Sequence, residues 1–276
     1  MGTATILSNG IEMPRIGLGL WEVPAETAQQ TIEMGAELGY RHFDGAAAYQ
    51  NEEGFGAGIR SCGVAREELF VTTKLQNGNQ GYSKALAAFD ASLQRLGLDY
   101  VDLYLIHWPV PKWGLYLETW KAFEEIYASG RAKAIGISNF TPRLIAEVTA
   151  AARVQPMVNQ IECHPSMQQR DCEAASRDAG MVVQAYSPIG RGVDLENPVV
   201  KEVVAERGCT PAQAILAWHL AQGRVVLPKS VHRERLAENL AAGDVVLTAE
   251  DLARIDALEA GQRQRTDPEI MEHPQM

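Results

Sequence analysis

Residues 69–108 read LFVTTKLQNGNQGYSKALAAFDASLQRLGLDYVDLYLIHW, and this stretch sets the pattern that the rest of the chain follows. The short apolar runs at 69–75 and 101–108 are typical of buried strands. Between them lies an amphipathic stretch, 85–97, which ends at Gly97, where a glycine is typical of a helix C-terminus. Two buried strands joined by a helix predict parallel strands of one sheet.

The same alternation extends over most of the chain. Strands are predicted at 15–20, 41–45, 69–75, 101–108, 134–140, 157–163, 182–188 and 224–230, and helical patterns include 25–39, 85–97, 117–130 and 170–180. Eight strands alternating with helices predict an α/β fold, a (β/α)8 TIM barrel. The rival is an open doubly wound sheet, which for a dinucleotide carries G-x-G-x-x-G. Gly17-Leu18-Gly19 and Gly190-Arg191-Gly192 both lack the third glycine, so the barrel is favoured.

The two ends of the chain lie outside this alternation. Two apolar runs around Asn9-Gly10 predict an N-terminal β-hairpin that closes the bottom of the barrel, because both residues tolerate positive φ in a tight turn. The segment 262–276 is polar and irregular, and is expected either to fray or to fold over one mouth. No linker or repeat divides the chain, so residues 1–276 are expected to form a single domain.

Composition excludes several classes of protein. With 46% hydrophobic residues among 276, the chain can bury a core, which excludes disorder. No apolar run reaches membrane-spanning length, and the first residues lack a secretory signal, so a cytoplasmic protein is expected. Four separated cysteines predict reduced thiols, and a net charge of −10 argues against nucleic-acid binding. We expect a monomer.

Polar side chains follow nearly every predicted strand. They are Asp44, Lys74, His107, Ser138 with Asn139, Gln160, Tyr186 with Ser187, and Lys229 with Ser230. In a barrel, the C-terminal ends of the strands surround the active site, so this register predicts a site. Taken singly, Asp44 could cap a helix, Lys74 could be a surface lysine and His107 a core histidine.

Asp44, Tyr49, Lys74 and His107 together can carry acid catalysis. A tyrosine is a poor acid at neutral pH, but a nearby lysine ammonium is expected to lower its pKa, with Asp44 holding that lysine charged. A neutral His107 can orient a carbonyl oxygen near the tyrosine. The cluster is then suited to protonate a carbonyl as hydride arrives from a cofactor.

The other histidines show no ligand spacing, so no metal site is expected. His164, beside Cys163 in IECHP, is interpreted as structural. No metal role is assigned to His42, His219, His232 and His273.

Three motifs resemble the aldo-keto reductase family. They are GYRHFDGAAAYQNEEGFG at 39–56, KAIGISNF at 133–140 and LPKSVHRERLAENL at 227–240, with TTKL and LIHWP between them. The likeness runs from the hairpin to about Asn239, and among members it is to short bacterial enzymes similar to 2,5-diketo-D-gluconate reductase. By position, the resemblance places the catalytic tetrad on Asp44, Tyr49, Lys74 and His107, with Tyr49 as proton donor and NADPH as hydride source.

The resemblance also implies a cofactor site. Ser138, Asn139 and Gln160 would bind the nicotinamide amide, and Tyr186 would stack on its ring. The pyrophosphate would lie along Ser187, Pro188, Ile189, Gly190 and Gly192. The third motif would hold the adenosine phosphate through Lys229, Ser230, Val231, His232, Arg235, Glu238 and Asn239. Arg235 and Lys229 suit the 2′-phosphate that distinguishes NADPH from NADH.

The substrate wall is expected to contain Trp21, Tyr49, His107 and Trp108, with Trp113 from the following loop, whereas Trp120 and Trp218 are assigned to the core. Such walls suit small aldehydes, ketones, keto-sugars or diketo acids. Three positions depart from the family. Gly45 replaces a usual threonine or serine, and Gln76 replaces an aromatic pocket residue, which predicts a more polar mouth. His232 stands where a basic residue often serves the adenosine phosphate.

Two other functions remain open from the sequence. Barrel aldolases form a Schiff base on a strand-end lysine, and Lys74 has that position, so a lyase is one alternative. A cofactor-binding sensor or scaffold without turnover is the other, although it would not need the complete tetrad. The expected activity is therefore NADPH-dependent carbonyl reduction.

Overall fold

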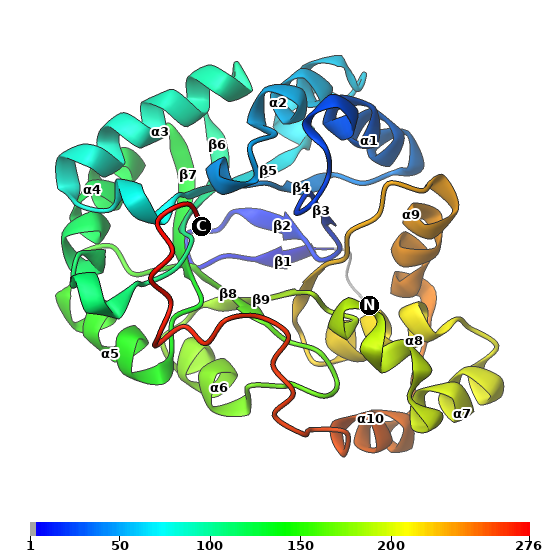
Figure 1. Ribbon diagram of the computed structural model, residues 1–276. Helices are drawn as coiled ribbons and strands as arrows, with labels where there is room; N and C mark the ends of the chain where they lie inside the picture. Colours follow the sequence, from blue (N-terminus) through cyan, green and yellow to red (C-terminus); the bar gives the residue numbers. More distant parts are fainter. Residues whose placement is uncertain (1–3) are drawn as a thin grey trace.

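The computed structural model describes residues 4–276, so the first three residues of the expected domain lie outside the described part. Eight parallel strands form a barrel with helices around it (Figure 1). The strands are β3 (Leu18–Gly19), β4 (His42–Asp44), β5 (Phe70–Leu75), β6 (Val101–Ile106), β7 (Ala132–Ser138), β8 (Val158–Glu162), β9 (Val182–Tyr186) and β10 (Val225–Leu227). A parallel bridge between Ile16 and Val226 joins the first strand region to the last. The predicted barrel is confirmed, and each predicted strand overlaps one of these eight, although β7 begins two residues before the predicted range 134–140.

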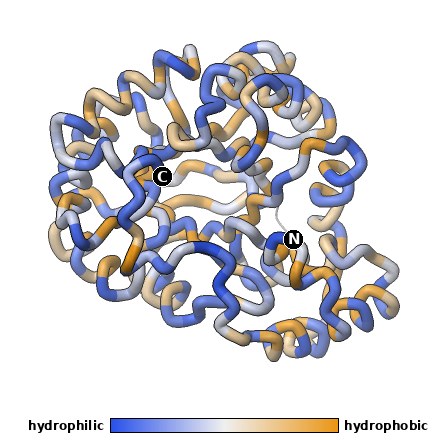
Figure 2. The backbone as a smooth tube through the Cα atoms, in the orientation of Figure 1, coloured by the Kyte–Doolittle hydropathy of each residue, from blue (hydrophilic) through white to orange (hydrophobic). Residues whose placement is uncertain are grey.

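Helices cover the outside of the barrel. They are α1 (Ala25–Leu38), α2 (Glu52–Ser61), α3 (Tyr82–Leu96), α4 (Tyr116–Ala128), α5 (Pro142–Ala151), α6 (Arg170–Asp178), α7 (Pro198–Arg207), α8 (Pro211–Ala221), α9 (Arg233–Leu240) and α10 (Ala249–Asp256). Helix α1 buries Ala28, Ile32 and Gly35, one stripe of a helix with a 3.6-residue period. Figure 2 shows hydrophobic and hydrophilic colours alternating along the outer helices. Gly39 and Gly97 follow α1 and α3 at positive φ, as predicted.

Short 3₁₀ helices lie in several loops. They are η1 (Ala47–Tyr49), η2 (Arg66–Glu68), η3 (Asn77–Asn79), η4 (Pro111–Trp113), η5 (Gly190–Glu196) and η6 (Ala241–Asp244). Of these, η1 and η5 matter most for function, because they carry residues of the main cavity.

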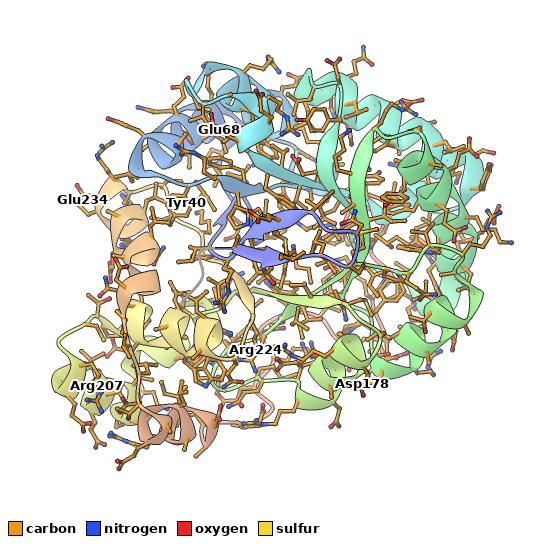
Figure 3. The ribbon with its side chains drawn as sticks, turned by 180° about the vertical axis from the view of Figure 1, so that it is seen from behind. Tyr40, Glu68, Asp178, Arg207, Arg224 and Glu234 are labelled. Carbon is orange, nitrogen blue, oxygen red and sulfur yellow. The ribbon has the colours of Figure 1, made fainter. Side chains whose placement is uncertain are left out.

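The N-terminal hairpin crosses one end of the barrel (Figure 3). It consists of β1 (Ala4–Ile6) and β2 (Glu12–Pro14), and it buries Leu7 and Met13 in an apolar cluster with barrel residues such as Phe70. The expected closure is confirmed, but the turn differs from the prediction. Only Gly10 takes a positive φ (88°), because the loop has three residues between Leu7 and Ile11, with the glycine at the left-handed position.

The C-terminal tail, 262–276, crosses the opposite end of the barrel (Figure 1, red). Backbone N–H groups of Asn77 and Gly78 donate to the carbonyls of Met276 (2.6 Å) and Pro274 (2.8 Å). Met271 packs against Trp108. Of the two expected arrangements, the tail therefore folds over a mouth. Across residues 4–276, no helix is long and apolar enough to cross a membrane.

Candidate active site

Three buried polar residues and the half-buried Tyr49 meet at the mouth covered by the tail. Asp44 ends β4, Lys74 lies near the end of β5, His107 follows β6 and Tyr49 ends η1. Parallel pairing of β4 with β5 and of β5 with β6 brings the strand ends to one place. The structure thus brings together the tetrad that the sequence predicted.

Lys74 is the centre of this cluster. Its fully buried Nζ donates to Asp44 Oδ1 (2.5 Å), to the Gly45 carbonyl (2.8 Å) and to Tyr49 Oη (3.3 Å). These three acceptors satisfy the three donors of an ammonium. Because Tyr49 Oη accepts from Lys74, its own proton points elsewhere, and within residues 4–276 no acceptor takes it. The Tyr49 ring is edge-on to those of Trp21 (5.0 Å between centroids) and His107 (5.7 Å).

Burial controls the protonation of the cluster. Burial, with the charge of Asp44, raises the pKa of Tyr49 well above its usual value. Burial lowers the pKa of Lys74, and Asp44 opposes this shift. Burial and the nearby Lys74 hold the pKa of His107 well below its usual value, so His107 is neutral. The expectation of a lowered pKa for Tyr49 is wrong, because burial dominates.

The residues predicted to bind the nicotinamide amide are bonded to one another. Asn139 Nδ2 donates to the His107 carbonyl (2.9 Å) and to Ser138 Oγ (3.1 Å), and Ser138 Oγ donates to the Gln160 carbonyl (2.8 Å). Tyr186 donates to Asn139 Oδ1 (2.8 Å). Gln160 Nε2 donates to Asp44 Oδ2 (2.8 Å) and Gln184 Oε1 (2.9 Å), which leaves Gln160 Oε1 as an acceptor.

A cavity of about 390 Å³ extends from the tetrad along these residues. Its predicted lining residues include Trp21, Tyr49, His107, Trp108, Ser138, Asn139, Gln160, Tyr186, Ser187, Pro188, Ile189, Gly192, Lys229 and Arg235. Residues that sequence reasoning missed also line it, among them Glu22, Arg191, Leu195, Arg265 and Met276. No motif marks Arg265 or Met276, since only the fold of the tail brings them to the mouth.

Several predicted cofactor residues do not line this cavity. Gly190 faces Asp194 instead, and a Cβ at Gly190 would lie 2.2 Å from Asp194 Oδ2. Ser230 Oγ accepts from the backbone of His232 (3.1 Å), which makes a local turn before α9, and Val231 packs against the core. Glu238 and Asn239 lie at the far end of α9, where the Glu238 carbonyl accepts from Gln213.

Two predictions about the substrate wall are wrong. Gln76 lines a separate cavity between η1, α2 and α3, because the tail binds the loop that follows it. Trp113 packs beside Trp108, Met271 and Met276 without lining the main cavity. Trp120 and Trp218 are buried in helices, as predicted. His164 is also fully buried.

Lys229 and Arg235 form a cationic end of the cavity. Both are exposed, and among the residues that the structure describes neither forms an ion pair. Arg233, two residues earlier, is instead paired with Glu37 (2.7 Å). Gly192 has a φ of 98° and nothing within 4 Å of its Cβ position, so its backbone is open to a ligand. An elongated ligand with an amide at one end and a phosphate at the other fits this set of donors.

Comparison with known proteins agrees with this geometry. The model of the Aldo/keto reductase family matches residues 15–260. An aldo-keto reductase of Mycolicibacterium smegmatis is 43% identical over 268 residues, covering 97% of this chain and 98% of the relative. Glyoxal reductase of Bacillus subtilis is 43% identical over 264 residues, covering 95% of both. A mutant of Gox0644 solved in complex with NADPH has a TM-score of 0.94 at 39% identity, covering 98% of this chain and 99% of that one. The chain therefore belongs to the aldo/keto reductase family of oxidoreductases.

Proposed function

We propose that this protein reduces small aldehydes and ketones with NADPH, and that Tyr49 supplies the proton. The observation that carries this proposal is the geometry around Lys74, whose ammonium donates to Asp44, Gly45 and Tyr49 and so leaves the Tyr49 proton free. A protonated Tyr49 facing the cavity is the group that a carbonyl oxygen needs as hydride arrives.

The roles of the tetrad follow from its hydrogen bonds and charges. When bound, the nicotinamide cofactor supplies the hydride. Tyr49 donates its proton to the carbonyl oxygen, and neutral His107 orients that oxygen. The phenolate left on Tyr49 is stabilised by Lys74, which is 3.3 Å away. Asp44 accepts from both Lys74 and Gln160, so it fixes the lysine while both of its oxygens are satisfied.

The cofactor would lie along the cavity from Gln160 to Arg235. Gln160 Oε1 would accept from the nicotinamide amide, and Ser138 and Asn139, which bond to each other, would offer their polar atoms to the same amide. Tyr186, oriented by its bond to Asn139, offers its ring face. Lys229 and Arg235 bind the 2′-phosphate as a point charge and a planar fork, which favours NADPH over NADH. A mutant of the structurally similar Gox0644 was solved in complex with NADPH, which supports NADPH as the cofactor.

The substrate class follows from the walls near Tyr49. Trp21, Trp108 and Met276 line the same cavity as Tyr49 and His107, the two residues that would bond the carbonyl oxygen. Apolar walls around one polar pair suit small aldehydes, dicarbonyls and keto-sugars. A relative that is named glyoxal reductase supports small dicarbonyls. Gln76 lies outside this cavity, so it does not make the mouth more polar.

The test is a panel of carbonyl compounds with the purified protein, following NADPH absorbance. Methylglyoxal, aromatic aldehydes, diketo acids and keto-sugars cover the proposed classes. We expect NADPH consumption that matches alcohol formation. A cofactor-binding sensor gives NADPH binding without any turnover.

Borohydride trapping separates reduction from the lyase alternative. Lys74 is fully buried and its ammonium already has three acceptors, so it offers no free amine to a substrate. We expect no adduct on Lys74 by peptide mass spectrometry after borohydride treatment with each substrate. A trapped adduct on Lys74 would favour the lyase.

A further inference from the structure

His164 lies in a buried cluster just beyond the end of β8. His164 and Glu162 have no exposed surface, and Asp194 is 2% exposed. His164 Nδ1 is 2.8 Å from Asp194 Oδ2, and His164 Nε2 is 3.2 Å from Glu162 Oε1. An imidazole with a carboxylate at each nitrogen donates twice only when it is protonated. Burial lowers the pKa of His164, but the bonds to Asp194 and Glu162 outweigh burial and raise it to about 9.

Asp194 connects His164 to the cofactor-side loop, which we define as residues 187–197. Ser187, Ile189 and Gly192 of this loop line the cavity, whereas Asp194 points to its buried side. Gly190 gives Asp194 room, since a Cβ there would lie 2.2 Å from Asp194 Oδ2 and 3.1 Å from His164 Nδ1. The loop is thus held by this buried charge-assisted bond, together with the buried hydrogen bond between His219 Nε2 and the Pro188 carbonyl (3.0 Å).

Glu162 connects His164 to the start of the tail. Its Oε1 accepts from the backbone N–H of Gln264 (2.5 Å), and its Oε2 from that of Arg265 (3.2 Å). The Arg265 side chain lines the cavity and lies over the Trp21 ring, with 5.1 Å from guanidinium carbon to ring centroid. The orientation of this cavity wall therefore depends on Glu162.

We propose that His164 is a positioning residue that couples the cofactor-side loop to the tail through Asp194 and Glu162. This inference rests on the proposed function, because its consequence is tighter NADPH binding. His164 does not line the cavity, so it acts only through the two walls that it joins. Loss of the bond to Asp194 would loosen the cofactor-side loop, and loss of the bond to Glu162 would loosen the start of the tail. Either loss would also weaken the remaining bond, since both bonds share one imidazolium.

Charged and titratable groups from several elements surround His164. Asp194 of η5 and Glu162 of β8 face its two nitrogens. Arg263 of the tail is 3.7 Å from Glu162 Oε2. From α8, His219 has a pKa held well below its usual value by burial, so it stays neutral, and burial raises the pKa of Cys163 to about 12.

The experiment measures the Kd for NADPH by fluorescence quenching in Asp194→Asn, which keeps the shape but removes the charge. Losing one charge-assisted bond is expected to raise the Kd about tenfold. The kcat with saturating NADPH should stay within about threefold, because the tetrad is untouched. Asp251→Asn is the matched control. Asp251 is a buried carboxylate paired with Arg207 (2.6 Å) outside the cavity, so its loss should lower Tm without changing the Kd.

A double-mutant cycle tests the coupling. Glu162→Gln should also raise the Kd for NADPH. In the double variant with Asp194→Asn, the Kd should rise by less than the product of the two single-variant factors. Wild-type protein provides a test without substitution. Its Kd should rise as the pH increases through about 9, when His164 loses its proton. In Asp194→Asn this pH dependence should be much weaker.

Three results would overturn the inference: an unchanged Kd in a folded Asp194→Asn variant, multiplicative effects in the cycle, or a wild-type Kd that stays flat above pH 9. If wild-type protein binds no NADPH at neutral pH, the proposed function fails instead. The two failures are therefore distinguishable.

Discussion

The two ends of the barrel are closed in opposite ways. At the hairpin end, Leu7 and Met13 pack into an apolar cluster with barrel residues, and the polar contact to this pair is a weak one, from Gln184 Nε2 to Met13 Sδ (3.0 Å). At the tail end, Asp44, Lys74 and His107 are just as buried but are polar, and Lys74 is held by three hydrogen bonds. The difference teaches that one end of this barrel provides stability and the other chemistry.

Removing the Tyr49 hydroxyl should give the largest effect at the tail end. Tyr49→Phe keeps the ring but removes the acid, so kcat should fall by about 10²–10⁴-fold while the Kd for NADPH stays within a few-fold. Lys74→Met acts on the same proton. The fall in kcat of the double variant should therefore be far smaller than the product of the two single-variant factors. Steady-state kinetics and fluorescence quenching measure both.

Tyr104→Phe is the matched control for Tyr49→Phe. Tyr104 is buried in β6, and within the described residues its hydroxyl has no partner. Its loss should leave kcat unchanged. If Tyr49→Phe keeps more than about a tenth of the wild-type kcat while chemistry is rate-limiting, Tyr49 is not the acid, and His107 becomes the candidate.

Truncating the hairpin core should affect stability alone. Leu7 is buried in the same apolar cluster as Met13, so Leu7→Ala should reduce the free energy of unfolding by about 2–5 kcal/mol. Because Leu7 lies at the end opposite the tetrad, kcat/KM at a temperature where the variant is folded should be unchanged. Chemical denaturation and steady-state kinetics measure the two quantities. A large loss of kcat/KM in the folded variant would contradict the division between the two ends.

At the tail end, Lys229 and Arg235 should bind the 2′-phosphate of the cofactor. Arg235→Ala should weaken NADPH binding by about 10–100-fold and NADH binding much less, because a charge-assisted bond to the 2′-phosphate is lost. Added salt should likewise weaken NADPH binding more than NADH binding. Arg233→Ala is the control, since Arg233 is paired with Glu37. Equal losses for both cofactors would show that Arg235 does not recognise the phosphate.

The tail should affect substrate binding, by a smaller factor than Arg235 affects NADPH binding. Met276→Ala opens the cavity wall, so KM for small aldehydes should change by a few-fold, on the order of one lost apolar contact. Gln76→Ala should leave KM unchanged, because Gln76 lines the separate cavity. A KM change in Gln76→Ala that exceeds the one in Met276→Ala would reverse this assignment.

The pH dependence of kcat should show the smallest change. Tyr49 must be protonated to act, and burial raises its pKa well above the usual value. A raised pKa keeps the acid protonated to higher pH, so kcat with saturating NADPH should stay level up to about pH 10. A decline of kcat centred at or below neutral pH would show that another group carries the proton.

Sequence reasoning reached the tetrad because strand ends have fixed neighbours. Once eight strands were predicted, the parallel register brought Asp44, Lys74 and His107 to one mouth without any knowledge of side-chain positions. The alternation of apolar runs and amphipathic helices, the hairpin and the positive-φ glycines after α1 and α3 are also local properties. They depend on neighbouring residues, so the amino-acid sequence determined them by itself.

The tertiary structure decided what depends on segments distant in the sequence. Met276 lies in the cavity and Gln76 outside it because the tail binds the loop at 77–78, and no periodicity indicates that contact. The raised pKa of Tyr49 follows from the depth at which packing buries it. The role of His164 depends on Asp194, thirty residues away, and on a tail that begins about a hundred residues later. Desolvation and long-range contacts arise only when the chain has folded, which is why sequence patterns do not contain them.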